Sequence, residues 1–175
     1  GHEEAVEEFQ ELLEEKVKDA TLSWSEARSL IRKDQRYQHA SDELSRSERE
    51  ELYKERVDDM LGGIEKRMIA TLDKMDGVTW HSSWDSVWKK LEREKRGKEF
   101  GQLSSRSRER SFKRWQAEKL KAATELLAAA LAEIPEVALA ADPQSKVVPE
   151  EVKELEAYKA LAPAGEERDE AFWGA

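Results

Sequence analysis

Residues 23–53 read SWSEARSLIRKDQRYQHASDELSRSEREELY, and this stretch decides the fold class. It contains the pattern Ser-x-x-Glu twice, at Ser23–Glu26 and at Ser45–Glu48. In this pattern the serine hydroxyl and the glutamate carboxylate each bind a backbone amide that a helix start leaves without a partner. Trp24, Ala27 and Ile31 follow the first copy at helical spacing. The stretch therefore predicts two helix starts, with a short irregular turn before the second helix.

The composition around this stretch also favours helices. All four prolines come after residue 134, and Glu, Lys, Arg, Leu and Ala are abundant throughout the 175 residues. Proline breaks helices, whereas these five residue types form them readily. Val6, Phe9 and Leu13 form one further apolar face at helical spacing. We therefore predict an all-α chain.

A repeat of about sixty residues organises the chain. Ser23-Trp24 recurs as Ser83-Trp84, and Leu44-Ser45 recurs as Leu103-Ser104. Arg49, four residues before an aromatic residue, recurs as Arg108 and as Arg168. Matches in register indicate repeated supersecondary units. We predict three units, at residues 3–61, 62–121 and 122–175, the third of them degenerate or partial.

The junctions between these units differ in their helix breakers. No glycine or proline interrupts the chain between Ser107 and Ile134, so we predict one continuous helix that links the second and third units. Gly62-Gly63 lies at the first junction, and each glycine inside a helix costs about 1 kcal/mol. A kink or hinge is therefore expected there.

The motifs of the first unit resemble those of the FF domain. The matching pieces are an apolar helix with a phenylalanine, a Ser-Trp helix start, an Asp-x-Arg-Tyr segment and a Glu-Arg-x-x-Leu-Tyr helix. In this sequence they are Phe9, Ser23-Trp24, Asp34-Gln35-Arg36-Tyr37 and Glu48-Arg49-Glu50-Glu51-Leu52-Tyr53. The two phenylalanines that name the family correspond to Phe9 and Tyr53, to Met68 and Phe112, and to Leu127 and Phe172.

The resemblance implies tandem three-helix bundles, each with a short 3-10 turn before its last helix. It implies a structural core built from Phe9, Trp24, Tyr37, Tyr53, Met68, Trp84, Phe112 and Phe172. The tandem spacing is most similar to the C-terminal FF repeats of the transcription elongation regulator family, with the WW/FF pre-mRNA-processing splicing factors second. A non-catalytic nuclear scaffold is implied, which links RNA polymerase II elongation to splicing. Its implied partners are the phosphorylated C-terminal tail of the polymerase and splicing or elongation factors.

Charge differs strongly between the predicted units. Residues 62–121 hold 16 basic and 9 acidic side chains, a net of +7, whereas residues 1–61 and 122–175 each have a net of −8. A positive surface attracts phosphates and acidic peptides, and arginine pairs well with phosphate. We predict an acidic-ligand or phosphopeptide site at Lys89, Lys90, Arg93, Arg96, Lys113 and Arg114.

Two other interpretations of this charge remain open. The basic unit could simply complement its acidic neighbours, since charge runs are commonly solvated faces. It could also bind RNA, although flanking segments of net −8 would repel an extended polyanion. Arg108 is left out of the predicted site, because its repeat partners Arg49 and Arg168 indicate a structural role in every unit.

Several classes of function find no support in the sequence. The chain has no cysteine, which excludes disulfides and thiolate chemistry. No run of eighteen apolar residues or signal peptide occurs, so neither a membrane partner nor secretion is expected. His2, His39 and His81 are the only histidines, and no catalytic motif or phosphate-binding loop is found. The start Gly1-His2 is typical of a cleavage scar. We expect a monomeric fragment of a longer protein, with no enzymatic activity, no cofactor and no metal.

Overall fold

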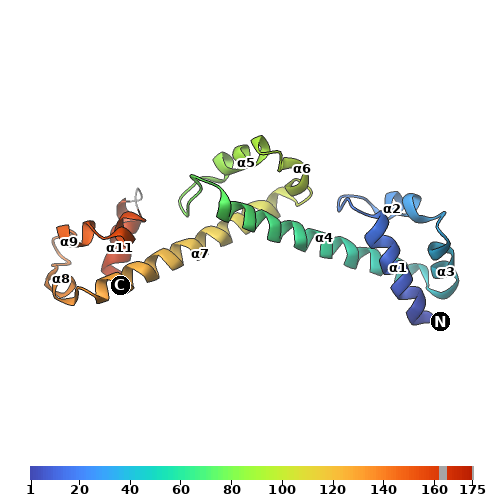
Figure 1. Ribbon diagram of the computed structural model, residues 1–175, viewed down its shortest axis with the longest axis horizontal. Coiled ribbons are helices and arrows are strands. Elements are labelled where there is room, and N and C mark those ends of the chain that lie inside the picture. Colours follow the sequence, from blue (N-terminus) through green and yellow to red (C-terminus); the bar gives the residue numbers. More distant parts are fainter. Residues whose placement is uncertain (162–164, 175) are drawn as a thin grey trace. The chain divides into compact units, whose positions relative to one another are not determined.

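The computed structural model describes residues 1–161 and 165–174, which are helices joined by loops (Figure 1). The chain forms two compact units. Unit 1 comprises Gly1–Met75 and Trp88–Glu109, and unit 2 comprises Asp76–Val87 and Arg110–Ala175. The all-α prediction is confirmed for the described residues. The three predicted boundaries are not tested by this division and stay a prediction.

The first four helices follow the start signals in the sequence. They are α1 (His2–Lys16), α2 (Trp24–Ile31), α3 (Gln35–Glu43) and α4 (Arg46–Lys74). Both predicted capping boxes are present: Ser23 caps α2 with Glu26, and Ser45 caps α4 with Glu48. α1 contacts the other three helices. Their shared core is made of buried apolar side chains, among them Phe9, Leu12, Leu13, Ile31, Tyr37 and Tyr53.

The prediction of a short irregular or 3-10 turn before the last helix of the first bundle is wrong. That segment is α3, an α-helix of 9 residues. Asp34 starts it, because its carboxylate Oδ1 accepts a hydrogen bond from the backbone N–H of Arg36 at 2.9 Å. Tyr37 and Ala40, one helical turn apart, are both buried on its inner face. The cap and this narrow apolar face together stabilise a full helix in place of a turn.

Helix α4 continues without interruption through Gly62 and Gly63, so the expected hinge is not a break in the helix. Tyr53 packs into the first core, and Ile64, Met68 and Leu72 are buried farther along the helix. These last three residues are spaced by four, so they share one helical face. Burial on both sides of the glycine pair offsets the intrinsic helix cost of the two glycines.

The rest of unit 1 lies between Trp88 and Glu109 and includes the end of α5 (Trp84–Arg93), α6 (Gly97–Phe100) and the start of α7 (Ser105–Ala132). Leu91, Phe100 and Leu103 are buried there. Two polar contacts join this part to the helices before it. The Ala20 backbone N–H donates to Gln102 at 2.9 Å, and Arg67 is paired with Glu99.

Unit 2 contains most of α7, which runs from Ser105 to Ala132 as one helix. The sequence predicted a helix from Ser107 to Ile134, and its function as a link between FF-type bundles stays a prediction. α8 (Pro135–Ala140), α9 (Glu150–Lys153), α10 (Glu156–Lys159) and α11 (Gly165–Gly174) follow. The core of this part is formed by the buried side chains of Leu127, Leu131, Val148, Val152, Tyr158, Leu161 and Phe172.

Six of the eight predicted core residues are buried: Phe9, Tyr37, Tyr53, Met68, Phe112 and Phe172. The other two, Trp24 and Trp84, are partly buried and pack against aromatic rings of the core. Each begins a helix directly after its cap, where one face of the side chain meets solvent. Trp24 lies edge-on to Phe9 and 5.5 Å from the Tyr53 ring, measured between ring centres. Trp84 lies 5.2 Å from Phe112 in the same way.

Within residues 1–161 and 165–174, no helix combines the length and the apolar character that a membrane crossing requires.

Candidate functional site

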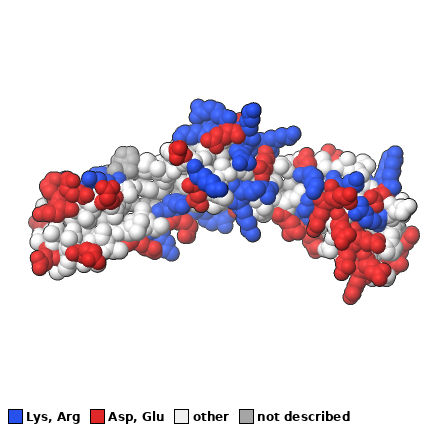
Figure 2. All heavy atoms as spheres, in the orientation of Figure 1, with Lys and Arg blue, Asp and Glu red and all other residues white. Residues whose placement is uncertain are grey.

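The predicted basic site is distributed over both units. Lys89, Lys90 and Arg93 lie on α5 and Arg96 follows it, all in unit 1, and Lys90 is the least exposed of the four. Figure 2 shows Lys and Arg side chains gathered over α5 and α6. Arg96 lies 3.7 Å from the carboxylate of Glu99, which is also paired with Arg67, so part of its charge is compensated. Lys113 and Arg114 are exposed on the part of α7 that belongs to unit 2.

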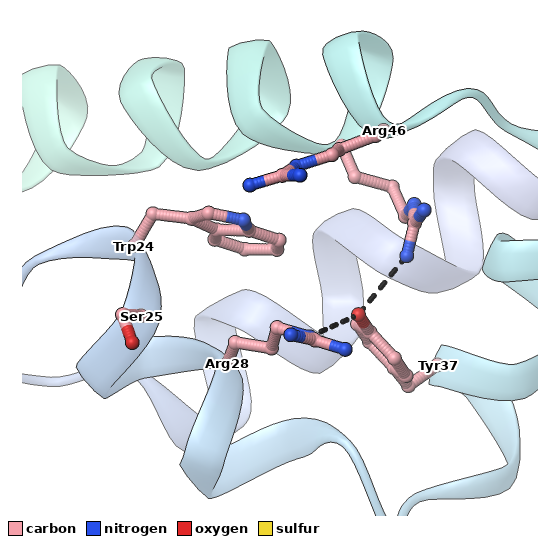
Figure 3. A pocket seen from close by; sticks show the side chains of 6 residues that line it. Trp24, Ser25, Arg28, Tyr37 and Arg46 are labelled. Atoms are coloured by element: carbon pink, nitrogen blue, oxygen red, sulfur yellow. Dashed lines mark hydrogen bonds between the residues drawn. The ribbon is translucent and has the colours of Figure 1, made fainter.

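A second cationic site, which the sequence did not predict, lies among the first four helices. A pocket of about 200 Å³ is lined by Trp24, Ser25 and Arg28 from α2, Tyr37 from α3, and Arg46 and Arg49 from α4. Figure 3 shows the side chains of Trp24, Arg28, Tyr37 and Arg46 converging from these three helices. We call this the arginine pocket. It brings three guanidinium groups and one indole ring around a space large enough for one side chain.

Tyr37 is the centre of the hydrogen bonds in the arginine pocket. Its hydroxyl accepts from Arg28 Nε at 2.9 Å and from an Arg49 terminal nitrogen at 3.0 Å (Figure 3). A guanidinium can only donate, so the tyrosine oxygen must be the acceptor in both bonds. The same Arg49 nitrogen also donates to the Ser41 hydroxyl at 3.1 Å. The hydroxyl proton of Tyr37 has no acceptor among the described residues.

Positive charge in the arginine pocket is largely uncompensated. Arg46 pairs with Glu50 at 3.1 Å, but the Arg46 side chain is 82% exposed. Exposed pairs of this kind contribute little to stability. In the described part of the chain, no carboxylate lies within ion-pair distance of Arg28 or Arg49. This is unusual in a segment, residues 1–61, that carries 18 acidic side chains.

An apolar groove adjoins the arginine pocket. It has a volume of about 270 Å³, and its largely apolar surface is bordered by two carboxylates. The lining residues are Leu22, Ser23, Trp24, Glu50, Tyr53, Lys54, Val57 and Asp58. Trp24 lines both spaces, which explains why it is only partly buried. The Tyr53 hydroxyl donates to the Leu22 carbonyl, and burial raises the pKa of Tyr53. An apolar surface next to cations suits a peptide that carries both kinds of side chain.

The repeat-related arginines all lie over aromatic rings. The guanidinium carbon of Arg49 is 5.5 Å from the centre of the Tyr37 ring, and that of Arg108 is 4.4 Å from the Trp88 ring. In unit 2, the same atom of Arg168 is 4.5 Å from the Tyr158 ring. Cation–π contacts of this length are stabilising. Each of the three arginines therefore packs on an aromatic ring, as a structural role requires.

Sequence reasoning missed the arginine pocket for identifiable reasons. Arg28, Arg46 and Arg49 belong to the acidic first segment, and they come from two helices whose crossing the sequence does not show. One sequence signal could have indicated the pocket: the number of residues between each arginine and the serine that caps its helix. Arg28 follows Ser23 by five residues and Arg49 follows Ser45 by four, so both lie about one turn into helices that start side by side in the pocket.

Within residues 1–161 and 165–174, no three side chains of His, Asp or Glu come together as metal ligands. His39 pairs with Glu8 and His2 with Glu48, both near the surface, and the bond to Glu8 raises the pKa of His39.

Among known protein families, the FF domain matches residues 4–56 of the chain. The matched range begins in α1 and ends in the first half of α4, and it contains every residue of the arginine pocket. An FF domain is therefore present at the start of the chain. FF domains are generally protein-interaction modules rather than catalytic folds.

Proposed function

We propose that this chain is a non-catalytic protein-interaction scaffold whose helical modules hold acidic or phosphorylated peptides. The observation that carries the proposal is the FF domain at residues 4–56, whose surface combines three arginines with an apolar groove. Carboxylates and phosphates pair with guanidinium groups through two parallel hydrogen bonds. An apolar groove beside them supplies affinity that charge alone does not.

We also propose a parent and a cellular setting. The repeated motifs resemble the FF arrays of the transcription elongation regulator family, so the partners would be the phosphorylated C-terminal tail of RNA polymerase II and splicing or elongation factors in the nucleus. Arg49, Arg108 and Arg168, each over an aromatic ring, support three repeated units at residues 3–61, 62–121 and 122–175. The chain would then work as a monomer that presents several docking surfaces in series.

The basic residues Lys89, Lys90, Arg93 and Arg96 form a proposed second docking surface in this scaffold. Three of the four are exposed, and they lie in a segment of high positive charge. Because solvent-exposed cations attract anions over about 10 Å at 0.1 M salt, they would steer acidic peptides toward the chain. Lys113 and Arg114, on α7, would add to the local positive charge of residues 110–121.

The experiment compares three titrations of the whole chain: a phosphorylated polymerase-tail peptide, the same peptide without phosphate, and a short RNA. We expect the phosphopeptide to bind best and the RNA to bind weakly. RNA binding that exceeds phosphopeptide binding would favour the alternative function, an RNA-binding helical module.

Charge reversal tests the second docking surface. Lys90→Glu, Arg93→Glu and Arg96→Glu together should weaken phosphopeptide binding severalfold. The control variant reverses the charges of Lys16, Lys18 and Arg32. None of these residues lines the arginine pocket, and none lies on α5. Equal losses in both triple variants would exclude a specific role for the basic residues of α5.

A further inference from the structure

We propose that the arginine pocket is a phosphate site, which binds the phosphorylated side chain of a serine or threonine in a partner peptide. The inference rests on the proposed function only in taking the partner to be a peptide. With a volume of about 200 Å³, the pocket is smaller than typical small-molecule sites, which are roughly 300–1,000 Å³. One short phosphorylated side chain fits such a space better than a free cofactor does.

The donors of the pocket match a phosphate group. Arg28 uses only its Nε to hold Tyr37, which leaves its two terminal nitrogens to donate. Among the residues that the structure describes, Arg46 pairs with Glu50 alone, at the exposed surface, so it can turn to a stronger acceptor at little cost. A phosphate oxygen could also accept the Tyr37 hydroxyl proton, which has no acceptor among the described residues. A phosphomonoester offers about two negative charges and three acceptor oxygens to these groups.

In unit 2, a tyrosine that lies under an arginine donates its hydroxyl proton to an anionic oxygen. The Tyr158 hydroxyl donates to the Asp169 carboxylate at 2.7 Å, while Arg168 lies over the Tyr158 ring. Arg168 corresponds to Arg49 and Tyr158 to Tyr37 in the repeat. In the third predicted repeat, the carboxylate that the tyrosine hydroxyl binds therefore comes from the chain itself. At the first position, Glu50 takes the place of Asp169 but pairs with Arg46, so the Tyr37 hydroxyl still lacks an anion.

The middle repeat has lost the pocket by substitution. Trp88 stands in the place of Arg28, Gly97 in the place of Tyr37 and Ser105 in the place of Arg46. The Trp88 ring lies against Arg108, and Arg108 donates to the Leu103 carbonyl at 2.8 Å. Thus the FF domain at residues 4–56 keeps three arginines around a tyrosine hydroxyl, whereas the middle segment does not.

The acidic surroundings of the pocket predict its salt response. Glutamates along α1 give the first segment its net negative charge, and Figure 2 shows them gathered over that helix. Salt screens both the attraction of the pocket and the repulsion by these carboxylates. Phosphate binding in the pocket should therefore weaken less with salt than peptide binding by the basic residues of α5.

The test uses the whole chain and two variants with equal charge change. Arg28→Gln with Arg46→Gln removes two donors from the pocket. Arg32→Gln with Lys33→Gln is the control, since both residues are exposed and neither lines the pocket. Each protein is titrated with a polymerase-tail peptide carrying one phosphoserine, with the same peptide without phosphate, and with inorganic phosphate. Calorimetry gives the dissociation constants, and the indole N–H resonance of Trp24 reports local binding.

We expect the pocket variant to lose about tenfold in affinity for the phosphopeptide, and the control to lose less than about twofold. Inorganic phosphate should shift the Trp24 resonance in the parent and the control but not in the pocket variant. Phosphopeptide binding that is equal in both variants would overturn the phosphate site and leave the interaction scaffold standing. If no peptide binds the parent, the scaffold proposal fails, and the inorganic phosphate titration alone decides the pocket: a missing Trp24 shift overturns it.

Discussion

Arg49 on α4 donates to the Tyr37 hydroxyl on α3 at 3.0 Å, and its guanidinium carbon lies 5.5 Å from the centre of the same ring. Arg28 on α2 donates to the same oxygen. One buried phenol therefore joins three helices of the FF domain and fixes the positions of two guanidinium groups. Because the side chains that hold the helices together also line the pocket, stability and anion binding are coupled at this residue.

Replacement of Tyr37 by Phe tests this coupling. Loss of the hydroxyl removes the acceptor of two hydrogen bonds, and we expect a cost of about 1–2 kcal/mol in the free energy of unfolding. Phosphopeptide affinity should also fall severalfold, because Arg28 and Arg49 are no longer held in place. Denaturant unfolding and calorimetry measure the two effects.

The matched control for Tyr37→Phe is Tyr53→Phe. The Tyr53 hydroxyl donates to the Leu22 carbonyl and does not line the arginine pocket. Tyr53 lines the adjoining apolar groove, but Tyr53→Phe keeps the apolar ring in place there. We therefore expect a similar loss of stability with phosphopeptide affinity nearly unchanged. If both variants reduced affinity equally, the effect would come from general loosening of the domain, and the specific role of Tyr37 would be wrong.

The sequence predicted those parts of the fold that depend on local chemistry. Ser23 and Ser45 marked the starts of α2 and α4, because a capping box acts within four consecutive residues. α3 was missed, since its apolar face is only Tyr37 and Ala40 and its start depends on a single carboxylate, that of Asp34.

The candidate site was harder to predict than the helices. Net charge averaged over sixty residues predicted an anion-binding site within residues 62–121. The arginine pocket instead lies in residues 1–61, a segment with a net charge of −8. The pocket is cationic because three arginines meet there and, among the described residues, no carboxylate forms an ion pair with Arg28 or Arg49. Both features depend on how α2, α3 and α4 cross. Tertiary contacts of this kind have no periodic signature in the sequence.

Gly62→Ala should stabilise the chain. The residue lies inside α4, and a β-carbon added there meets no atom within 4 Å. Alanine restricts the unfolded chain and favours the helix, so we expect a gain of up to about 1 kcal/mol, measured by denaturant unfolding.

Two other glycines serve as comparisons for Gly62→Ala. At Gly63 a β-carbon would lie 3.2 Å from a terminal nitrogen of Arg67, a flexible group, so the gain should be smaller. At Gly101 it would lie 2.5 Å from the Gly97 carbonyl oxygen, and Gly101→Ala should destabilise by about 1–3 kcal/mol. A loss of stability in Gly62→Ala would show that the helix needs flexibility at this junction.

Asp34 should make the stability of the FF domain sensitive to acid. Hydrogen bonds from the side chain and the backbone of Arg36 lower the pKa of Asp34 to about 2, from an ordinary value of 3.8. A carboxylate with a lowered pKa stabilises the fold above its unfolded pKa, and this contribution is lost as the pH falls through the folded pKa. The stability difference between the parent and Asp34→Asn should therefore be constant at neutral pH and shrink between about pH 4 and pH 2.

Comparison of two substitutions separates the cap from the charge. Asparagine can still cap α3, whereas Asp34→Ala removes the cap as well and should cost about 1 kcal/mol more at pH 7. Thermal unfolding over this pH range measures both differences. Equal stabilities of the Asn and Ala variants would mean that the hydrogen bond to the Arg36 backbone N–H does not stabilise α3.

Tyr158 should give unit 2 the opposite response, at alkaline pH. Burial is the main cause that raises the pKa of Tyr158 to about 12, and the hydrogen bond to Asp169 adds to it. A tyrosine whose folded pKa lies above its unfolded value of 10.0 stabilises the fold below pH 10, and this contribution disappears as the pH rises through about 12.

Tyr158→Phe keeps the ring under Arg168 but lacks the ionisable hydroxyl. We expect it to cost about 1 kcal/mol at pH 7, and the difference from the parent should shrink between pH 10 and pH 12. Far-ultraviolet circular dichroism during denaturant unfolding at each pH measures this difference. A difference that stays constant up to pH 12 would show that the Tyr158 hydroxyl ionises as readily in the folded chain as in the unfolded one. In that case its bond to Asp169 could not be the model for how Tyr37 meets a phosphate.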